Sequence, residues 1–145
     1  MKKLFTLFIF FILFLTVTNA QSALTWADLA DVKIETVNDT ENFLTYNQAT
    51  FGEKIALRDS TEIYLTGYLI PIDAMGLTYA LSKNPNASCF FCGGAGPETV
   101  VLLRIRPSNF KRYKTDERLT FSGTLRLHEN DLKSFIYVLK NAEEY

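Results

Sequence analysis

Cysteine and histidine are scarce in this 145-residue chain, which contains two cysteines and one histidine. The two cysteines, Cys89 and Cys92, form one Cys-x-x-Cys motif, and His128 is the single histidine. A closed structural zinc site needs four ligands, so the cysteines of one chain cannot complete such a site by themselves. One histidine also leaves little for general acid–base catalysis. Any metal site in one chain therefore needs carboxylates or the histidine as further ligands, or stays open.

Motifs of the common enzyme classes are absent from the sequence as well. No Ser–His–Asp set stands out, and the chain has no G-x-S-x-G motif, no phosphate-binding glycine loop and no pair of carboxylates at a diagnostic spacing. Low-complexity stretches and internal repeats are also missing. The sequence therefore predicts a folded protein that is not an enzyme.

The N-terminus has the pattern of a signal peptide. Two basic residues, Lys2 and Lys3, precede an apolar run over residues 4–17, and a small residue, Ala20, follows at the expected cleavage site. The run is about 14 residues long, whereas a membrane-spanning helix needs about 20. We expect cleavage after Ala20, export to the periplasm or beyond, and a mature single domain over residues 21–145 without a stable membrane span. An uncleaved membrane anchor is the alternative.

Positive charge is limited in the expected mature chain. The 15 basic residues fall to 13 when Lys2 and Lys3 leave with the signal peptide, against 16 acidic residues, for a net charge of about −3. Nucleic acids and anionic membranes require clustered Lys and Arg, so neither is an expected partner. The one basic neighbourhood consists of five residues: Arg104, Arg106, Lys111, Arg112 and Lys114.

Most of the mature chain has the pattern of short β-strands. Residues 118–127 alternate cleanly between apolar and polar residues, and residues 62–70 are rich in aromatic and β-branched types. Further strands are expected over residues 77–81 and 98–105. Residues 134–139 are compatible with a strand or a helix, and their strand propensity favours the strand. A short helical turn is expected at residues 26–29, and the segment 31–40 is ambiguous. Internal glycines, Gly67 and Gly123, indicate a bulge or a barrel-type bend. We predict a small OB-like five-stranded barrel, with a β-sandwich as the alternative.

The Cys-x-x-Cys motif lies in a glycine-rich loop between two of these strands. Phe90 and Phe91 separate the cysteines and are candidates for contact with a partner. Three glycines and a proline follow the second cysteine. The glycines allow the backbone to turn sharply, and the proline fixes its direction; these residues are Gly93, Gly94, Gly96 and Pro97. The loop is the predicted functional site.

Three interpretations of the cysteine pair stay open. Two thiolates can bind a soft transition metal ion such as zinc or copper(I), with His128 or Glu98 as additional ligands, or Asp73, Glu129 or Asp131. In an oxidising compartment the same pair can form a disulfide that clips the loop. A thiol–disulfide oxidoreductase is the third interpretation, but redox motifs usually sit at the start of a helix and this one leads into a predicted strand.

The order of several motifs resembles a known family. Gly67-Tyr-Leu-Ile-Pro71, a short strand, and a cysteine-containing loop before an apolar strand resemble the exported bacterial domain of unknown function 3299. Trp26-x-x-Leu29 and Gly123-x-Leu125 are compatible with that family. The resemblance implies an OB-like barrel, a periplasmic location and an association with metal-uptake transporters, without an established activity. Relatives carry Cys-x-His where this chain has Cys89-Phe-Phe-Cys92.

Together these features predict a non-enzymatic exported binding module. We expect it to present the Cys-x-x-Cys loop to a transition metal ion, or to a partner in an envelope metal-transport system or another periplasmic protein.

Overall fold

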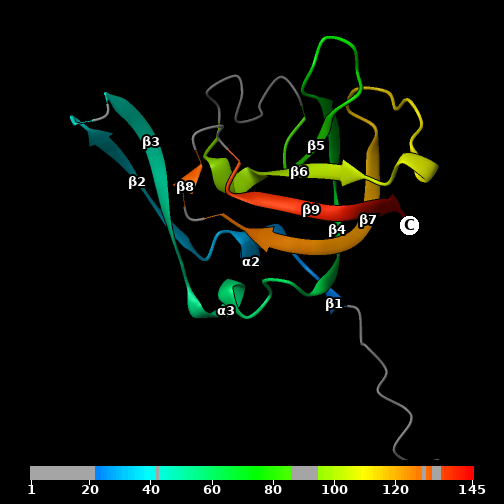
Figure 1. Cartoon of the computed structure of the whole chain (residues 1–145). Helices are drawn as coiled ribbons and strands as arrows, with labels where there is room; N and C mark the ends of the chain where they lie inside the picture. The colour runs from blue at the N-terminus through cyan, green and yellow to red at the C-terminus, as the bar shows by residue number, and fades with distance from the viewer. Residues whose placement is uncertain (1–21, 42, 86–94, 129, 132–134) are drawn as a thin grey trace, which may run out of the picture.

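The computed structural model describes residues 22–41, 43–85, 95–128, 130–131 and 135–145 (Figure 1). The predicted signal peptide lies outside the described residues. Among the residues that are described, no helix has the length and apolar character needed to cross a membrane.

Five strands close into a barrel. Their order around the barrel is β4-β5-β6-β9-β7, and β7 pairs back with β4. The pairs are antiparallel except β6 with β9, which run parallel. This closed five-stranded arrangement confirms the OB-like prediction and excludes the β-sandwich. The strands are β4 (Glu62–Pro71), β5 (Tyr79–Ser82), β6 (Val100–Ile105), β7 (Arg118–Leu127) and β9 (Tyr137–Glu144).

The barrel interior follows from the alternation of side chains along each strand. Ile63, Leu65 and Leu69 point inward from β4 and meet Phe121 and Leu125 of β7 in one apolar cluster. All five are almost fully buried. Burial of such side chains contributes about 1.5–3 kcal/mol each, so the pattern that predicted the strands also supplies the core.

The two internal glycines have different roles. At Gly67 the pairing of β4 with β7 continues without a register shift, and β4 begins to pair with β5 at Tyr68. Gly67 is therefore not a bulge in this pairing, and it lies where β4 takes β5 as a second partner. At Gly123 the register between β7 and β9 shifts between Ser122 and Thr124, which is the predicted irregularity.

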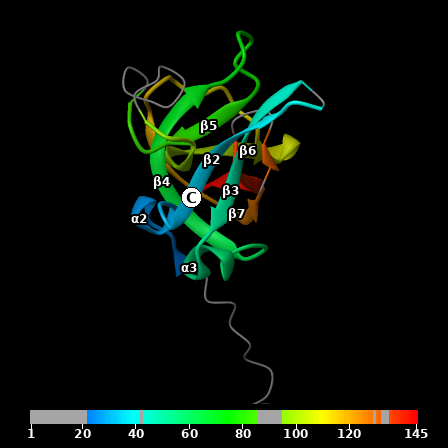
Figure 2. The same ribbon diagram turned by 90° about the vertical axis from the view of Figure 1, so that its left-hand side faces the viewer.

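A hairpin projects from the barrel, as Figures 1 and 2 both show. Strand β2 (Val32–Asp39) pairs along its whole length with β3 (Leu44–Phe51). The second strand was missed from the sequence, because its Asn, Gln and Thr residues give no apolar alternation. At the base, Val32, Ile34 and Phe51 pack against the barrel core. A two-residue strand, β8 (Asn130–Asp131), pairs with β3.

Short helical turns close the remaining connections. Helix α2 (Trp26–Leu29) is the predicted turn. In its capping box the Asp28 amide donates to the Thr25 hydroxyl oxygen, and the Thr25 amide donates to the Asp28 carboxylate. The others were not predicted: α3 (Glu53–Ala56), η3 (Pro97–Thr99) and η4 (Pro107–Asn109). β1 (Ser22–Ala23) pairs with β4 in parallel.

Three predicted strand boundaries are wrong. The strand expected from Glu98 starts at Val100, because Pro97 opens a 3-10 turn. The strand expected from Leu77 starts at Tyr79, because the Asp73 carboxylate accepts a hydrogen bond from the Leu77 amide and holds a turn. The last strand spans residues 137–144, not 134–139.

Candidate functional site

The cysteine loop connects two neighbouring strands of the barrel. Cys89, Phe90, Phe91, Cys92, Gly93 and Gly94 lie outside the described residues, whereas both feet of the loop are described. Ser82 at the end of β5 pairs with Val100 at the start of β6. The Lys83 amide then donates to the Thr99 carbonyl oxygen at 2.9 Å. These contacts hold the two feet side by side at one end of the barrel.

The returning foot is a compact turn that includes three predicted site residues. Pro97 opens η3, and the Thr99 hydroxyl donates to the Gly96 carbonyl oxygen at 2.7 Å. A Cβ atom on Gly96 would clash with the carboxylate oxygens of Glu98. The absence of a side chain at Gly96 therefore makes room for the Glu98 carboxylate, which folds back over the foot of the loop.

Glu98 also lies near a buried tyrosine. The Tyr137 hydroxyl donates to the Leu29 carbonyl oxygen at 2.7 Å, and Tyr137 is fully buried. Burial raises the pKa of Tyr137, and the negative charges of Glu98 and Asp31 raise it further. Both carboxylates are therefore close enough to this hydroxyl to act on it electrostatically. Sequence reasoning missed Asp31, whose carboxylate accepts the Lys54 amide at 3.1 Å.

The other predicted ligands are dispersed. His128 is exposed just after β7, and its amide donates to the Ile136 carbonyl oxygen. Asp73 is occupied in its turn, where hydrogen bonds from Leu77 and Thr78 lower the pKa of its carboxyl. Asp131 belongs to β8, and Glu129 lies outside the described residues. Within the described ranges, no three His, Cys, Asp or Glu residues come together as a metal-binding group.

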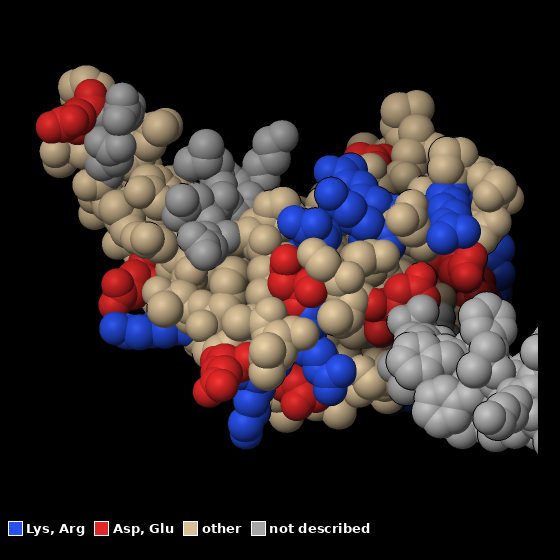
Figure 3. Space-filling view, turned by 60° about the horizontal axis from the view of Figure 1, so that its bottom comes forward, with Lys and Arg blue, Asp and Glu red and all other residues tan. Residues whose placement is uncertain are grey.

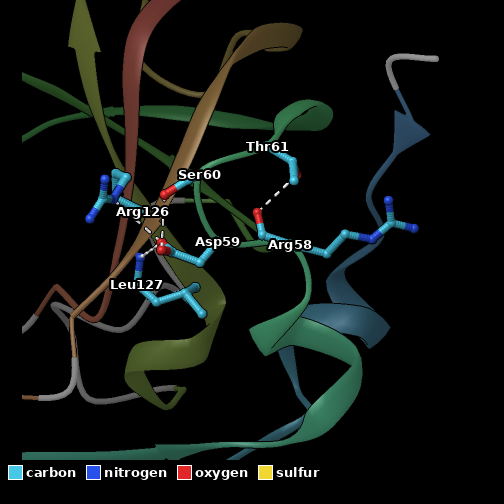
Figure 4. A network of polar contacts seen from close by, with 6 residues as sticks. All are labelled: Arg58, Asp59, Ser60, Thr61, Arg126 and Leu127. Atoms are coloured by element: carbon cyan, nitrogen blue, oxygen red, sulfur yellow. Dashed lines mark hydrogen bonds and ion pairs between the residues drawn. The ribbon is translucent and has the colours of Figure 1, made fainter. Parts of the chain in front are cut away.

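A polar network that the sequence did not predict lies at another corner of the barrel (Figure 4). The Asp59 carboxylate accepts hydrogen bonds from the Leu127 amide and the Ser60 hydroxyl, both at 3.0 Å. Arg126 lies 3.4 Å from the same carboxylate. The Ser60 amide also donates to the Leu125 carbonyl oxygen. This network fastens the turn before β4 to the end of β7, so its role is structural.

The Asp59→Asn variant tests this network through pH. Burial alone would raise the pKa of Asp59, but the Leu127 and Ser60 hydrogen bonds and the Arg126 charge bring it below its ordinary 3.8. The ionised carboxylate therefore stabilises the fold above pH 3.8, and this contribution is lost as pH falls through the folded-state pKa. We expect the wild type to exceed the variant in unfolding free energy at pH 7, by less than about 1 kcal/mol. Urea unfolding should show the difference shrinking below pH 4; a difference that grows there would contradict the assignment.

Comparison with known proteins bears on the fold. No protein-family model matches the sequence, and no curated protein matches it either. A crystal structure of a DUF3299 family protein from Pseudomonas aeruginosa matches the fold with a TM-score of 0.54. This chain has the fold of that DUF3299 protein. The match covers 87% of this chain and 97% of the other, with 15% sequence identity.

The DUF3299 match confirms the resemblance seen in the sequence at the level of the fold. At 15% identity it transfers no activity and no site residue. The replacement of the Cys-x-His motif of DUF3299 relatives by Cys89-Phe-Phe-Cys92 stays a prediction.

Proposed function

We propose that the chain is a non-enzymatic binding module of the periplasm that holds a transition metal ion, zinc or copper(I), on the thiolates of Cys89 and Cys92. Glu98 supplies a further ligand from the foot of the loop. Two thiolates and one carboxylate leave a zinc ion short of four protein ligands. Such an open site suits transfer of the ion to an envelope transport partner better than permanent structural binding.

The observation that carries this proposal is that backbone contacts hold both ends of the cysteine loop in place and that the Glu98 carboxylate lies beside one of them. The contacts Ser82–Val100 and Lys83–Thr99 fix where the loop leaves and returns to the barrel. Glu98 directly precedes Thr99 of this clamp, in η3, with its carboxylate turned back over Gly96. Because the two ends of the loop are already fixed, the loop loses less conformational entropy when it binds an ion. His128 has no comparable contact with the loop feet among the described residues.

A metal titration of the reduced mature protein, residues 21–145, tests the proposal. We expect one equivalent of Zn²⁺ or Cu⁺ to compete with a chromophoric chelator for the wild type. Cys89→Ser and Cys92→Ser should each abolish competition, because each removes a thiolate. Glu98→Gln should weaken it at least about 10-fold, because it removes a ligand and even the loss of an outer-shell partner has an effect of that size. Asp73→Asn is the matched control and should bind as the wild type does.

One outcome would contradict the metal site, and another would contradict the role of Glu98. Absence of any metal-dependent change at micromolar protein would exclude it. Equal loss of affinity in Asp73→Asn and Glu98→Gln would exclude Glu98 as a specific ligand.

A disulfide that clips the loop is the second candidate for the cysteine pair. It is favoured by the expected oxidising compartment. It would close a very small loop, so its stabilising effect would be modest. Thiol counting on protein purified without reductant distinguishes the two: two free thiols support the metal site, and none supports the disulfide. Unchanged unfolding free energy on reduction would remove a structural role for such a disulfide.

A further inference from the structure

The β2–β3 hairpin ends in an exposed apolar cluster. Phe43 is 94% exposed and Leu44 is 46% exposed. Phe43 also has a φ of 55°, a left-handed conformation that is uncommon for a bulky side chain. The fold thus holds an aromatic ring in solvent at the end of an arm, where it contributes nothing to the core. We call Phe43, Leu44 and the neighbouring Glu41 the acidic tip.

The sequence around the tip is acidic. Asp39 and Glu41 both precede Phe43, and no Lys or Arg occurs between residues 34 and 53. Red acidic atoms are visible at the end of the arm in Figure 3. This charge disfavours an anionic lipid surface and favours a surface that is apolar and positively charged.

The same chain carries such a surface on its loops. Met75, Leu77 and Phe110 are 68%, 49% and 37% exposed. Arg112 joins their two loops, because its Nη1 donates to the Met75 carbonyl oxygen at 3.0 Å. Phe110 lies beside the Tyr79 ring, with centroids 6.5 Å apart. We call these residues, with Arg112 and Lys114, the basic patch.

Positive charge predominates at the basic patch. Residues 100–115 include five Lys or Arg and no Asp or Glu, whereas Asp116 and Glu117 follow directly, and the Lys114 amide donates to the Glu117 carboxylate at 3.3 Å. Lys111 is partly neutralised, since its Nζ lies 2.6 Å from Glu144. Arg112 and Lys114 are exposed. They are therefore the cations that a docked acidic segment would meet.

We infer that the acidic tip of one molecule docks onto the basic patch of a second copy of this chain. Phe43 would cover Met75, Leu77 and Phe110, and Glu41 would face Arg112. The arm and the loop of residues 106–117 lie on opposite sides of the barrel (Figure 1), so a molecule cannot reach its own patch. The contact joins two different surfaces, and such contacts produce rings or open chains.

Sedimentation velocity of the mature protein, from about 10 µM to about 1 mM, tests the inference, since small interfaces associate in this range. We expect the mean molar mass to rise with concentration and to fall when salt screens the charges. Phe43→Ser and Arg112→Glu should each lower the association constant at least about 10-fold. Combining Arg112→Glu with Glu41→Arg should restore it. Leu57→Ser is the control, because Leu57 is 74% exposed and lies outside both surfaces.

Each contrary result overturns the inference. A monomer at every concentration means that the tip serves another protein or none. Equal effects of Leu57→Ser and Phe43→Ser mean that association is non-specific. Failure of the paired charge reversal to restore association means that Glu41 and Arg112 do not meet. Circular dichroism at each variant's working concentration confirms that all of them are folded.

Discussion

Replacing Tyr137 by Ala is expected to lower the free energy of unfolding by about 3–5 kcal/mol, the range for removing a buried aromatic ring. Tyr137 is fully buried, and its ring lies 5.6 Å from that of Phe51 at the base of the hairpin. Its hydroxyl reaches α2 through the Leu29 carbonyl oxygen. One side chain therefore joins β9, β3 and α2. Against a total stability of about 5–15 kcal/mol, this loss is large, and urea unfolding at pH 7 measures it.

Tyr137→Phe separates the ring from the hydroxyl. This variant keeps the packing and loses the hydrogen bond to Leu29, so we expect a smaller loss, about 1–2 kcal/mol. Because the raised pKa keeps the hydroxyl protonated, the loss should not change between pH 6 and pH 9. Equal destabilisation by Phe and Ala would mean that the hydrogen bond, and not the ring, holds these elements together.

Replacing Gly67 by Ala is expected to cost about 1–3 kcal/mol through overpacking. The added Cβ would lie 2.6 Å from the Ser82 carbonyl oxygen, 2.8 Å from Cζ2 of Trp26 and 2.9 Å from Cγ of Leu81. The two nearest of these neighbours, the Ser82 carbonyl and the Trp26 ring, cannot move away easily. The carbonyl belongs to the backbone of β5, and the Trp26 indole is held by its hydrogen bond to the Thr66 carbonyl oxygen at 2.8 Å.

Two measurements check the Gly67 prediction. Urea unfolding gives the loss of stability, and tryptophan emission reports the displacement of Trp26, the only tryptophan of the chain. Gly96→Ala is the matched control, since its Cβ would meet the flexible end of the Glu98 side chain and should cost less than about 0.5 kcal/mol. An unshifted emission spectrum with unchanged stability in Gly67→Ala would show that β4 and β5 separate easily.

Local pattern predicted some elements closely. Strand β7 begins at Arg118 and ends at Leu127 as its alternation indicated, and β4 exceeds its predicted range only by Pro71. Both strands have one face toward the core, so apolar residues recur at every second position of their sequences. Strand β3 has no such face along most of its length and is formed by its pairing with β2. Its residues therefore gave no signal.

Part of the candidate site could be predicted from the sequence, and part of it could not. The loop with Cys89 and Cys92 could be located from the sequence, because thiol pairs and glycines are recognisable by type and spacing. The clamp Lys83–Thr99 and the nearness of Glu98 and Asp31 to Tyr137 could not. Asp31 and Glu98 are 67 positions apart, and only the closure of the barrel brings α2 and η3 into contact.

The sequence by itself determined the barrel type, the position of the cysteine loop between two strands and its short supply of further ligands. These depend on residue type and on periodicity over a few residues, which local chemistry controls. Only the tertiary structure decided which carboxylate lies at the foot of the loop, where β4 changes partner, and that Phe43 stands in solvent on an arm. Those features depend on contacts between residues far apart in the chain, and such contacts exist only once the barrel has closed.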